Sequence, residues 1–382
     1  MASVISALTS GGGGISMTGD ASGILNLNSN GTNVVAVTST GATVTGTLAA
    51  TGAVTLTGSL NAPNTFGFKN RIINGGMNTD QRNAAASQTF TAAGALAYSV
   101  DRWYGYCTGA NVTGQQVAGA TTPTVTQNRY RFTGAASVTA VGFGQRIEQK
   151  NSYDLAGSTC TLSADLGISA TLTTVTWTAY YATTTADTFG SLASPTVTSI
   201  ATGTFTVGAA VTNFSANISI PAAATTGIQI LFTVGALTAG LTWTIGNVQL
   251  EKGSTATSFD FRAFPTELSL CQRYYFKTKS TALVTSFSVA FVESTTVANG
   301  SMVFPVSLRT SPAAIEQSGT AGDYAIRYVL TDATCSAVPY FVAANVDSSW
   351  FRFPVASGLT AGQAVMLRAL NTSAYLAWSA EL

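Results

Sequence analysis

The residue types that could carry catalysis are restricted in this sequence, because its 382 residues include no histidine. A serine–histidine–aspartate triad, a cysteine–histidine pair and a histidine-based zinc site are therefore excluded. Two carboxylates can still hydrolyse a glycosidic bond without histidine. The carboxylates available for this in the middle of the chain are Asp101, Glu148, Asp154, Asp165, Glu251 and Asp260. Several stand beside a cation: Asp101 beside Arg102, Glu251 beside Lys252 and Asp260 near Arg262. We therefore predict structural ion pairs and no catalytic residue.

The four cysteines, Cys107, Cys160, Cys271 and Cys335, are far apart in the sequence. A zinc or redox site would favour the close spacing of a CxxC pair, which is missing. We therefore expect neither a metal site nor a cofactor. Cys160 alternates with apolar residues such as Leu162, which predicts a buried thiol. The sequence leaves open whether two of these distant cysteines form a disulfide.

Aromatic residues with polar neighbours near the end of the chain form a candidate binding site. They are Tyr340, Asp347, Trp350, Phe351 and Arg352. An exposed aromatic ring can cover the apolar face of a sugar ring, while polar neighbours hydrogen-bond to the sugar hydroxyls. We predict that these residues bind a receptor. The alternative is that the aromatic side chains pack the core of a small domain.

Composition narrows the classes of partner. Hydrophobic residues make up 46% of the chain and charged residues 9%, with a formal net charge of +1. Abundant apolar residues argue against disorder, and the balanced charge argues against nucleic acid as a partner. Apolar residues are interspersed with Thr, Ser and Gly, and no run of about 18 apolar residues predicts insertion into a membrane.

Alternation of apolar and polar residues is the main structural signal, and it predicts an all-β fold. Val175, Trp177 and Ala179 alternate with threonines, and Trp243 and Ile245 do the same farther along. Such period-2 runs, separated by Gly, Pro and Ser clusters, are typical of antiparallel strands with one buried face. Many of them in succession favour a β-sandwich of jelly-roll type, with Trp103, Trp177 and Trp243 in its core.

Three zones of different composition suggest the domain organisation. Residues 1–66 carry one charge, Asp20, and alternate small apolar with hydroxyl residues. They are either a flexible leader or, as we favour, an intertwined β shaft in which several copies bury small residues together. Residues 67–263 hold the predicted jelly roll. Residues 264–382 begin with a stretch of helical character at 265–271 and continue as a smaller β tip domain.

Several motifs in the middle of the chain occur in the order typical of one known family. They are NRIINGGM at 70–77, DRW at 101–103, QRIEQ at 145–149, QLEKG at 249–253 and CQRYY at 271–275. Over about residues 69–276 the chain resembles a module common in tail fibres of tailed bacteriophages. The resemblance implies a homotrimeric virion fibre with a jelly-roll, carbohydrate-binding-like domain, and it carries over no catalytic residue.

Polar residues within these motifs form a second set of candidates. They are Asn74, Gln81, Asp101, Arg102, Gln145 and Glu148, all surrounded in sequence by Ile, Phe or Trp. Buried polar groups must be hydrogen-bonded, so we predict a structural polar network that holds strands and loops together. The alternative is that some of them line a binding groove.

The resulting hypothesis is a non-enzymatic fibre that is made in the host cytoplasm and becomes part of the virion. Residues 1–30 would attach to a tail or baseplate adaptor protein, and the tip would meet bacterial surface polysaccharide or lipopolysaccharide. One alternative is a capsid or collar decoration fibre without a receptor role. Another is a polysaccharide depolymerase, although no repeat of 20–50 residues indicates the usual solenoid.

Overall fold

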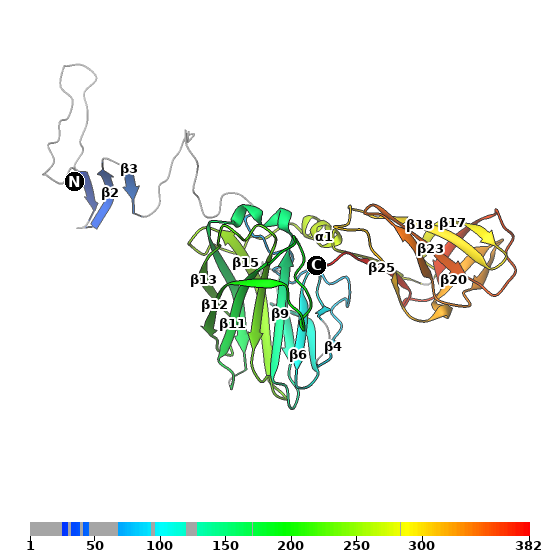
Figure 1. Ribbon diagram of the computed structural model, residues 1–382, viewed down its shortest axis with the longest axis horizontal. Helices are drawn as coiled ribbons and strands as arrows, with labels where there is room; N and C mark the ends of the chain where they lie inside the picture. Colours follow the sequence, from blue (N-terminus) through cyan, green and yellow to red (C-terminus); the bar gives the residue numbers. More distant parts are fainter. Residues whose placement is uncertain are drawn as a thin grey trace, which may run out of the picture. The chain divides into compact units, whose positions relative to one another are not determined.

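Figure 1 shows the computed structural model of the chain. It describes residues 25–29, 32–38, 41–45, 68–92, 96–119, 128–169, 171–282 and 284–382. The chain divides into two compact units, Met1–Ala62 and Pro63–Leu382. Strands dominate the described residues of both units, which confirms the predicted all-β class.

The first unit contains a three-stranded antiparallel sheet of β1 (Leu25–Ser29), β2 (Thr32–Thr38) and β3 (Gly41–Val44). Leu27, Val37 and Val44 are exposed on these strands, so the described residues of this unit enclose no core. The intertwined shaft predicted for 1–66, and the attachment segment 1–30, otherwise lie outside the described residues.

The second unit begins with a sandwich of two six-stranded antiparallel sheets. The first, called here the β15 sheet, has the order β13 (Thr212–Ser219), β10 (Thr159–Ile168), β15 (Thr242–Lys252), β8 (Asn128–Thr133), β7 (Val112–Ala118) and β4 (Gln88–Phe90). The second, the β14 sheet, has the order β12 (Val197–Thr206), β11 (Thr174–Ala182), β14 (Ile228–Val234), β9 (Ala140–Ile147), β6 (Tyr104–Thr108) and β5 (Ala97–Tyr98). The 3₁₀ helices η1 (Gln149–Asn151) and η2 (Tyr153–Leu155) follow β9.

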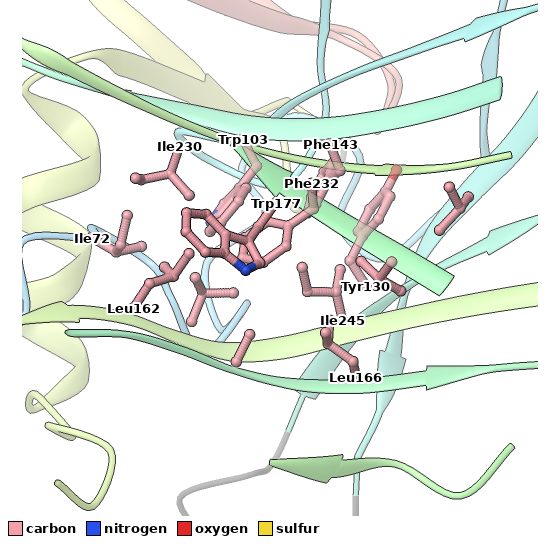
Figure 2. Packing of buried hydrophobic residues seen from close by; sticks show 14 of the residues in the cluster. Ile72, Trp103, Tyr130, Phe143, Leu162, Leu166, Trp177, Ile230, Phe232 and Ile245 are labelled. Atoms are coloured by element: carbon pink, nitrogen blue, oxygen red, sulfur yellow. The ribbon is translucent and has the colours of Figure 1, made fainter. Parts of the chain in front are cut away.

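The sandwich core lies between these two sheets and is rich in aromatic rings (Figure 2). Trp103, Trp177 and Trp243 are all buried there, as the alternation predicts. Trp103 stacks on Phe143 with ring centroids 4.8 Å apart. Large aromatic side chains bury much apolar area, so this cluster contributes strongly to the stability of the sandwich.

Strand β15 differs from the half-buried pattern expected for it, because both of its faces are buried. Gln249 and Glu251 lie on the face that alternation would leave to solvent. The chain segments that precede and follow the sandwich strands in the sequence cover this face. Asn70 Nδ2 donates to the Val248 carbonyl (3.0 Å), and the Asp260 N–H donates to Gln249 Oε1 (2.8 Å). The covering segments therefore supply hydrogen bonds to Gln249 and Glu251, which lets this central strand bury both residues.

The C-terminal part of the second unit starts with helix α1 (Phe264–Gln272), which has Pro265 in its first turn, where proline is well tolerated. A three-stranded sheet follows with the order β16 (Tyr275–Lys279), β25 (Tyr375–Ser379) and β19 (Glu316–Gln317). A seven-stranded sheet has the order β21 (Thr331–Thr334), β20 (Tyr324–Tyr328), β24 (Ala364–Ala369), β17 (Ser286–Ser294), β18 (Val297–Val303), β23 (Ser348–Pro354) and β22 (Tyr340–Ala344). The 3₁₀ helix η3 (Ala321–Asp323) precedes β20.

A second hydrophobic core, which includes Phe353, Leu367 and Trp378, lies inside this C-terminal part. The four cysteines are all buried and unpaired, so the open question of a disulfide is resolved in favour of free thiols. No helix among the described residues has the length and apolar character needed to span a bilayer.

Candidate functional site

The outer face of the seven-stranded sheet carries exposed apolar and aromatic side chains. We call it the aromatic face, and it consists of Val289, Phe291, Val303, Tyr340, Trp350, Arg352 and Met366. Trp350 is 53% exposed and Tyr340 41%. A contiguous exposed apolar patch on a soluble protein marks an interaction surface.

Strand register brings these residues together from distant parts of the sequence. Phe291 lies opposite Asn299, Asn299 opposite Arg352, and Arg352 opposite Tyr340. Directly opposed residues of antiparallel strands share a face and have neighbouring Cβ atoms. A single row therefore crosses four strands, β17, β18, β23 and β22, and Trp350 lies in the next row opposite Ser301.

Polar groups lie within reach of the rings on this face. An Arg352 N–H donates to Glu293 Oε1 at 2.6 Å, and both side chains are partly exposed. Asn299 Oδ1 and Arg352 Nε have no hydrogen-bond partner among the described residues, but both atoms are buried beneath the face. Two exposed aromatic rings beside a partly exposed arginine–glutamate pair can stack on a sugar ring and hydrogen-bond to its hydroxyls.

The other two predicted receptor residues lie elsewhere. Asp347 is exposed on the turn between β22 and β23, where its carboxylate accepts a hydrogen bond from Ser307 Oγ at 2.5 Å. Phe351 is 0% exposed and packs in the C-terminal core. The receptor role predicted for Phe351 is therefore corrected: successive side chains of a strand point to opposite faces, so Phe351 turns inward where Trp350 turns outward.

Sequence reasoning missed Val289, Phe291 and Met366. Alternation alone would place Phe287, Val289 and Phe291 on one face of β17. A register irregularity between Ser286 and Ser288 breaks this pattern, so Phe287 points inward while Val289 and Phe291 point outward. Which of the two faces meets solvent is decided by tertiary packing. Register also places Val289 beside Met366, a pairing that no local pattern reveals.

Asn74 and Gln145 tie the motif segment at 70–79 to the sandwich. Asn74 Nδ2 donates to the carbonyls of Thr79 (2.8 Å) and Asp101 (3.0 Å). Gln145 exchanges two hydrogen bonds with the backbone of Ile73: its Oε1 accepts at 2.9 Å and its Nε2 donates at 2.7 Å. Both side chains are buried. They supply hydrogen bonds to backbone groups, as a neighbouring strand would do within a sheet.

Gln81 and Asp101 extend the network to the C-terminal part. The Gln81 amide donates to Asp101 Oδ2 (2.6 Å) and to the Tyr275 carbonyl (2.8 Å), so it joins the sandwich to β16. Burial raises the pKa of Asp101 to about 7, although the hydrogen bonds from Gln81 act in the opposite direction. Asp101 is thus a carboxyl group that titrates near neutral pH inside the network.

Arg102 and Glu148 complete the network through Glu381 and through Arg273 and Tyr274 of the CQRYY motif. Arg102 forms a buried ion pair with Glu381, and its guanidinium stacks over the Tyr274 ring at 3.5 Å. Glu148 accepts hydrogen bonds from Arg273 Nη2 (2.7 Å) and the Tyr274 hydroxyl (2.9 Å). These contacts hold α1, β16 and the segment after β25 against the sandwich.

The predicted pairing of carboxylates with adjacent cations is corrected by the structure. Glu251 forms its ion pair with Lys69 rather than Lys252, because neighbouring residues of β15 point to opposite faces. Arg262 pairs with Glu267, not with Asp260. The remaining partners of the candidate carboxylates are Arg71 for Asp154, Asn213 and Asn247 for Asp165, and the Asn70 N–H for Asp260. In the part of the chain that the structure describes, no cluster of acidic or cysteine side chains could hold a metal ion.

Comparisons with known proteins give only distant structural likenesses. No protein-family model matches the chain, and no curated protein matches its sequence. The enzymatically active domain of tailspike protein 4 of bacteriophage CBA120 aligns at 16% identity and a TM-score of 0.31, over 48% of this chain and 22% of that chain. TmCBM61, solved with beta-1,4-galactotriose, aligns at 12% identity and a TM-score of 0.27, over 40% of this chain and 88% of that one. A putative sugar binding protein from Bacteroides thetaiotaomicron gives 12% identity and a TM-score of 0.30, over 48% of this chain and 100% of that one. At such TM-scores the function has to be argued from the residues of this chain.

Proposed function

We propose that this chain is the subunit of a homotrimeric, non-enzymatic fibre of a tailed bacteriophage that adheres to glycan on the bacterial surface. The observation that carries the proposal is the pair of exposed aromatic rings, Trp350 and Tyr340, beside Arg352 on the aromatic face. The motif resemblance over about residues 69–276 supplies the fibre context. The receptor would be surface polysaccharide or lipopolysaccharide.

The chemistry of the aromatic face suits weak, repeated binding to sugars. Trp350 and Tyr340 offer flat apolar surfaces, and the Arg352–Glu293 pair offers a donor and an acceptor for hydroxyl groups. A single contact of this kind binds weakly. Three copies on one fibre that engage together gain about 10²–10⁴ in avidity, which suffices for adhesion.

The burial and hydrogen bonding of three candidate carboxylates support the non-enzymatic part of the proposal. Asp101, Glu148 and Glu251 are buried and accept hydrogen bonds from structural partners. A glycosidase needs two carboxyl groups that flank an accessible scissile bond. In the proposal, residues 1–30 attach the fibre to a tail or baseplate adaptor protein.

Binding of the full chain to host cells tests the proposal. We expect Trp350→Ala and Tyr340→Ala together to lower the cell-bound fraction at least tenfold, because each loses one stacking surface. Tyr153→Ala, at an exposed tyrosine of η2 in the sandwich, is the matched control and should bind like the wild type. Unchanged binding by the double variant would place adhesion elsewhere.

Three further measurements separate the alternatives. Light scattering should give about three times 39.1 kDa, and a monomer would contradict the trimer. If Trp350→Ala lowers this mass, the aromatic face is a subunit interface rather than a receptor surface. Release of reducing ends from host polysaccharide would identify a depolymerase instead. An image of the whole virion distinguishes a tail fibre from a capsid or collar fibre.

A further inference from the structure

We infer that a pocket on the outer face of the β14 sheet binds one neutral six-membered sugar ring. The pocket has a volume of about 170 Å³. Its floor is formed by Tyr104, Arg146, Tyr180, Gln229 and Leu231, and its wall by residues 189–197. We call it the tyrosine pocket. It lies in the sandwich, apart from the aromatic face, and the inference does not depend on the proposed adhesion.

The floor of the tyrosine pocket follows from strand register. Tyr180 of β11 lies opposite Gln229 of β14, and Gln229 lies opposite Arg146 of β9, so the three residues form a row across the sheet. In the next row Tyr104 of β6 lies opposite Gly144. A Cβ at Gly144 would be only 2.5 Å from the Tyr104 hydroxyl oxygen, so the glycine is what lets this ring lie over the neighbouring strand.

The wall of the pocket is fixed by hydrogen bonds rather than left to fluctuate. Arg146 Nη2 donates to the Gly190 carbonyl at 2.8 Å. The Thr196 N–H donates to the Phe189 carbonyl at 3.1 Å, which closes the loop on itself. A pocket held open in this way costs a ligand little ordering free energy on binding.

Two polar groups of the floor make no hydrogen bond within the described residues and face the pocket. Tyr104 is 1% exposed and Gln229 7%, and both line the pocket. Gln229 Oε1 accepts from Arg146 Nε at 3.1 Å, which leaves the amide Nε2 free. Among the described residues no group hydrogen-bonds to that Nε2 or to the Tyr104 hydroxyl. Neither atom is among the buried polar atoms that lack a partner, so both face the open pocket and can hydrogen-bond to a ligand that enters it.

Size and polarity together select the class of ligand. An apolar cavity of about 150 Å³ holds one benzene ring, so the tyrosine pocket has room for one six-membered ring and not for an oligosaccharide. Tyr180, Leu192 and Leu231 provide apolar surface for the ring face, while Gln229 and Tyr104 provide a donor and a hydroxyl for its substituents. Arg146 already donates to three oxygens, which favours a neutral ring over an acidic one.

Saturation-transfer NMR on the full chain tests the inference, with glucose, galactose, mannose, N-acetylglucosamine and glucuronic acid as probes. We expect at least one neutral sugar to bind with a millimolar Kd, the range typical of a small contact. Tyr104→Phe removes only the hydroxyl, and Gln229→Glu keeps the acceptor for Arg146 but removes the donor. Each should weaken binding about three- to tenfold.

Matched variants make the outcome specific to this pocket. Tyr106→Phe, on the same strand but outside the pocket lining, and Trp350→Ala, on the aromatic face, should both bind the sugar like the wild type. Unchanged thermal denaturation of Tyr104→Phe verifies that its fold is intact. The inference is overturned if no neutral sugar binds the wild type, if only glucuronic acid binds, or if Tyr104→Phe and Gln229→Glu both bind like the wild type. Loss of binding in Trp350→Ala would instead assign the sugar to the aromatic face.

Discussion

The outer faces of the β15 sheet and of the seven-stranded sheet differ in what covers them. On the β15 sheet, segments outside the sheets cover Gln249 and Glu251 and supply hydrogen bonds to them. On the seven-stranded sheet, no described segment covers Val289, Phe291 or Trp350. The outer face of the β15 sheet buries polar groups within the chain. The outer face of the seven-stranded sheet leaves apolar groups exposed, where a second molecule can contact them. The difference separates a part that holds the fold together from a part that can contact a partner.

The largest effect is expected at the buried ion pair of the polar network, which, like the covered face of the β15 sheet, stabilises the fold. Glu381→Gln leaves the buried guanidinium of Arg102 without its carboxylate partner. Breaking a buried pair by removing one partner costs about 3–5 kcal/mol. Urea denaturation should therefore show a large loss in the free energy of unfolding. A loss below about 1 kcal/mol would mean that the pair contributes no more than a surface ion pair.

Adjacent residues of β23 give the next comparison, because Phe351 faces the core and Trp350 faces solvent. Phe351→Ala should lower the free energy of unfolding by about 3–5 kcal/mol, the usual cost of removing a buried phenylalanine. Trp350→Ala should change it by less than about 0.5 kcal/mol. Thermal or urea denaturation of both variants measures the contrast. Equal destabilisation would show that Trp350 is buried in the assembled protein.

A smaller effect is expected from pH at Asp101 in the polar network. The pKa of Asp101 is raised from 3.8 to about 7 by burial. Between these values the folded chain holds a proton that the unfolded chain has lost, so the contribution to stability is full below pH 3.8 and is lost as the pH rises to about 7. Asp101→Asn should remove this part of the pH dependence. Urea denaturation of both proteins across this window checks it, and identical pH profiles would contradict the raised pKa.

The smallest effect is expected at the Arg352–Glu293 pair on the aromatic face. Glu293→Gln removes one charge of a partly exposed pair, which costs less than about 1 kcal/mol. It is the matched counterpart of Glu381→Gln, since both replace a carboxylate bound to arginine. Urea denaturation of both variants gives the comparison directly, and a loss at Glu293 as large as at Glu381 would remove the distinction between the two regions.

The local alternation of apolar and polar residues was enough to predict which side chains form the cores. It was not enough to predict which residues meet at the aromatic face and in the polar network. Trp103, Trp177 and Trp243 follow from period-2 alternation, and so does the outward direction of Trp350 relative to Phe351. The pairing of Tyr340 with Arg352 depends on strand register, which alternation does not determine. The ion pair of Arg102 with Glu381 joins residues 279 positions apart, so nothing in the sequence around Arg102 indicates its partner.

The position of β25 in the three-stranded sheet also has a consequence for the order of folding. β25 lies between β16 and β19, and Tyr275 of β16 pairs with Ser379. During synthesis β16 leaves the ribosome roughly a hundred residues before its partner strand, and such non-local pairings form slowly. Until β25 arrives, β16 and β19 present open edges that can pair with another nascent chain. Two chains that are translated side by side from one messenger RNA can therefore pair through β16 or β19 while this sheet is still incomplete.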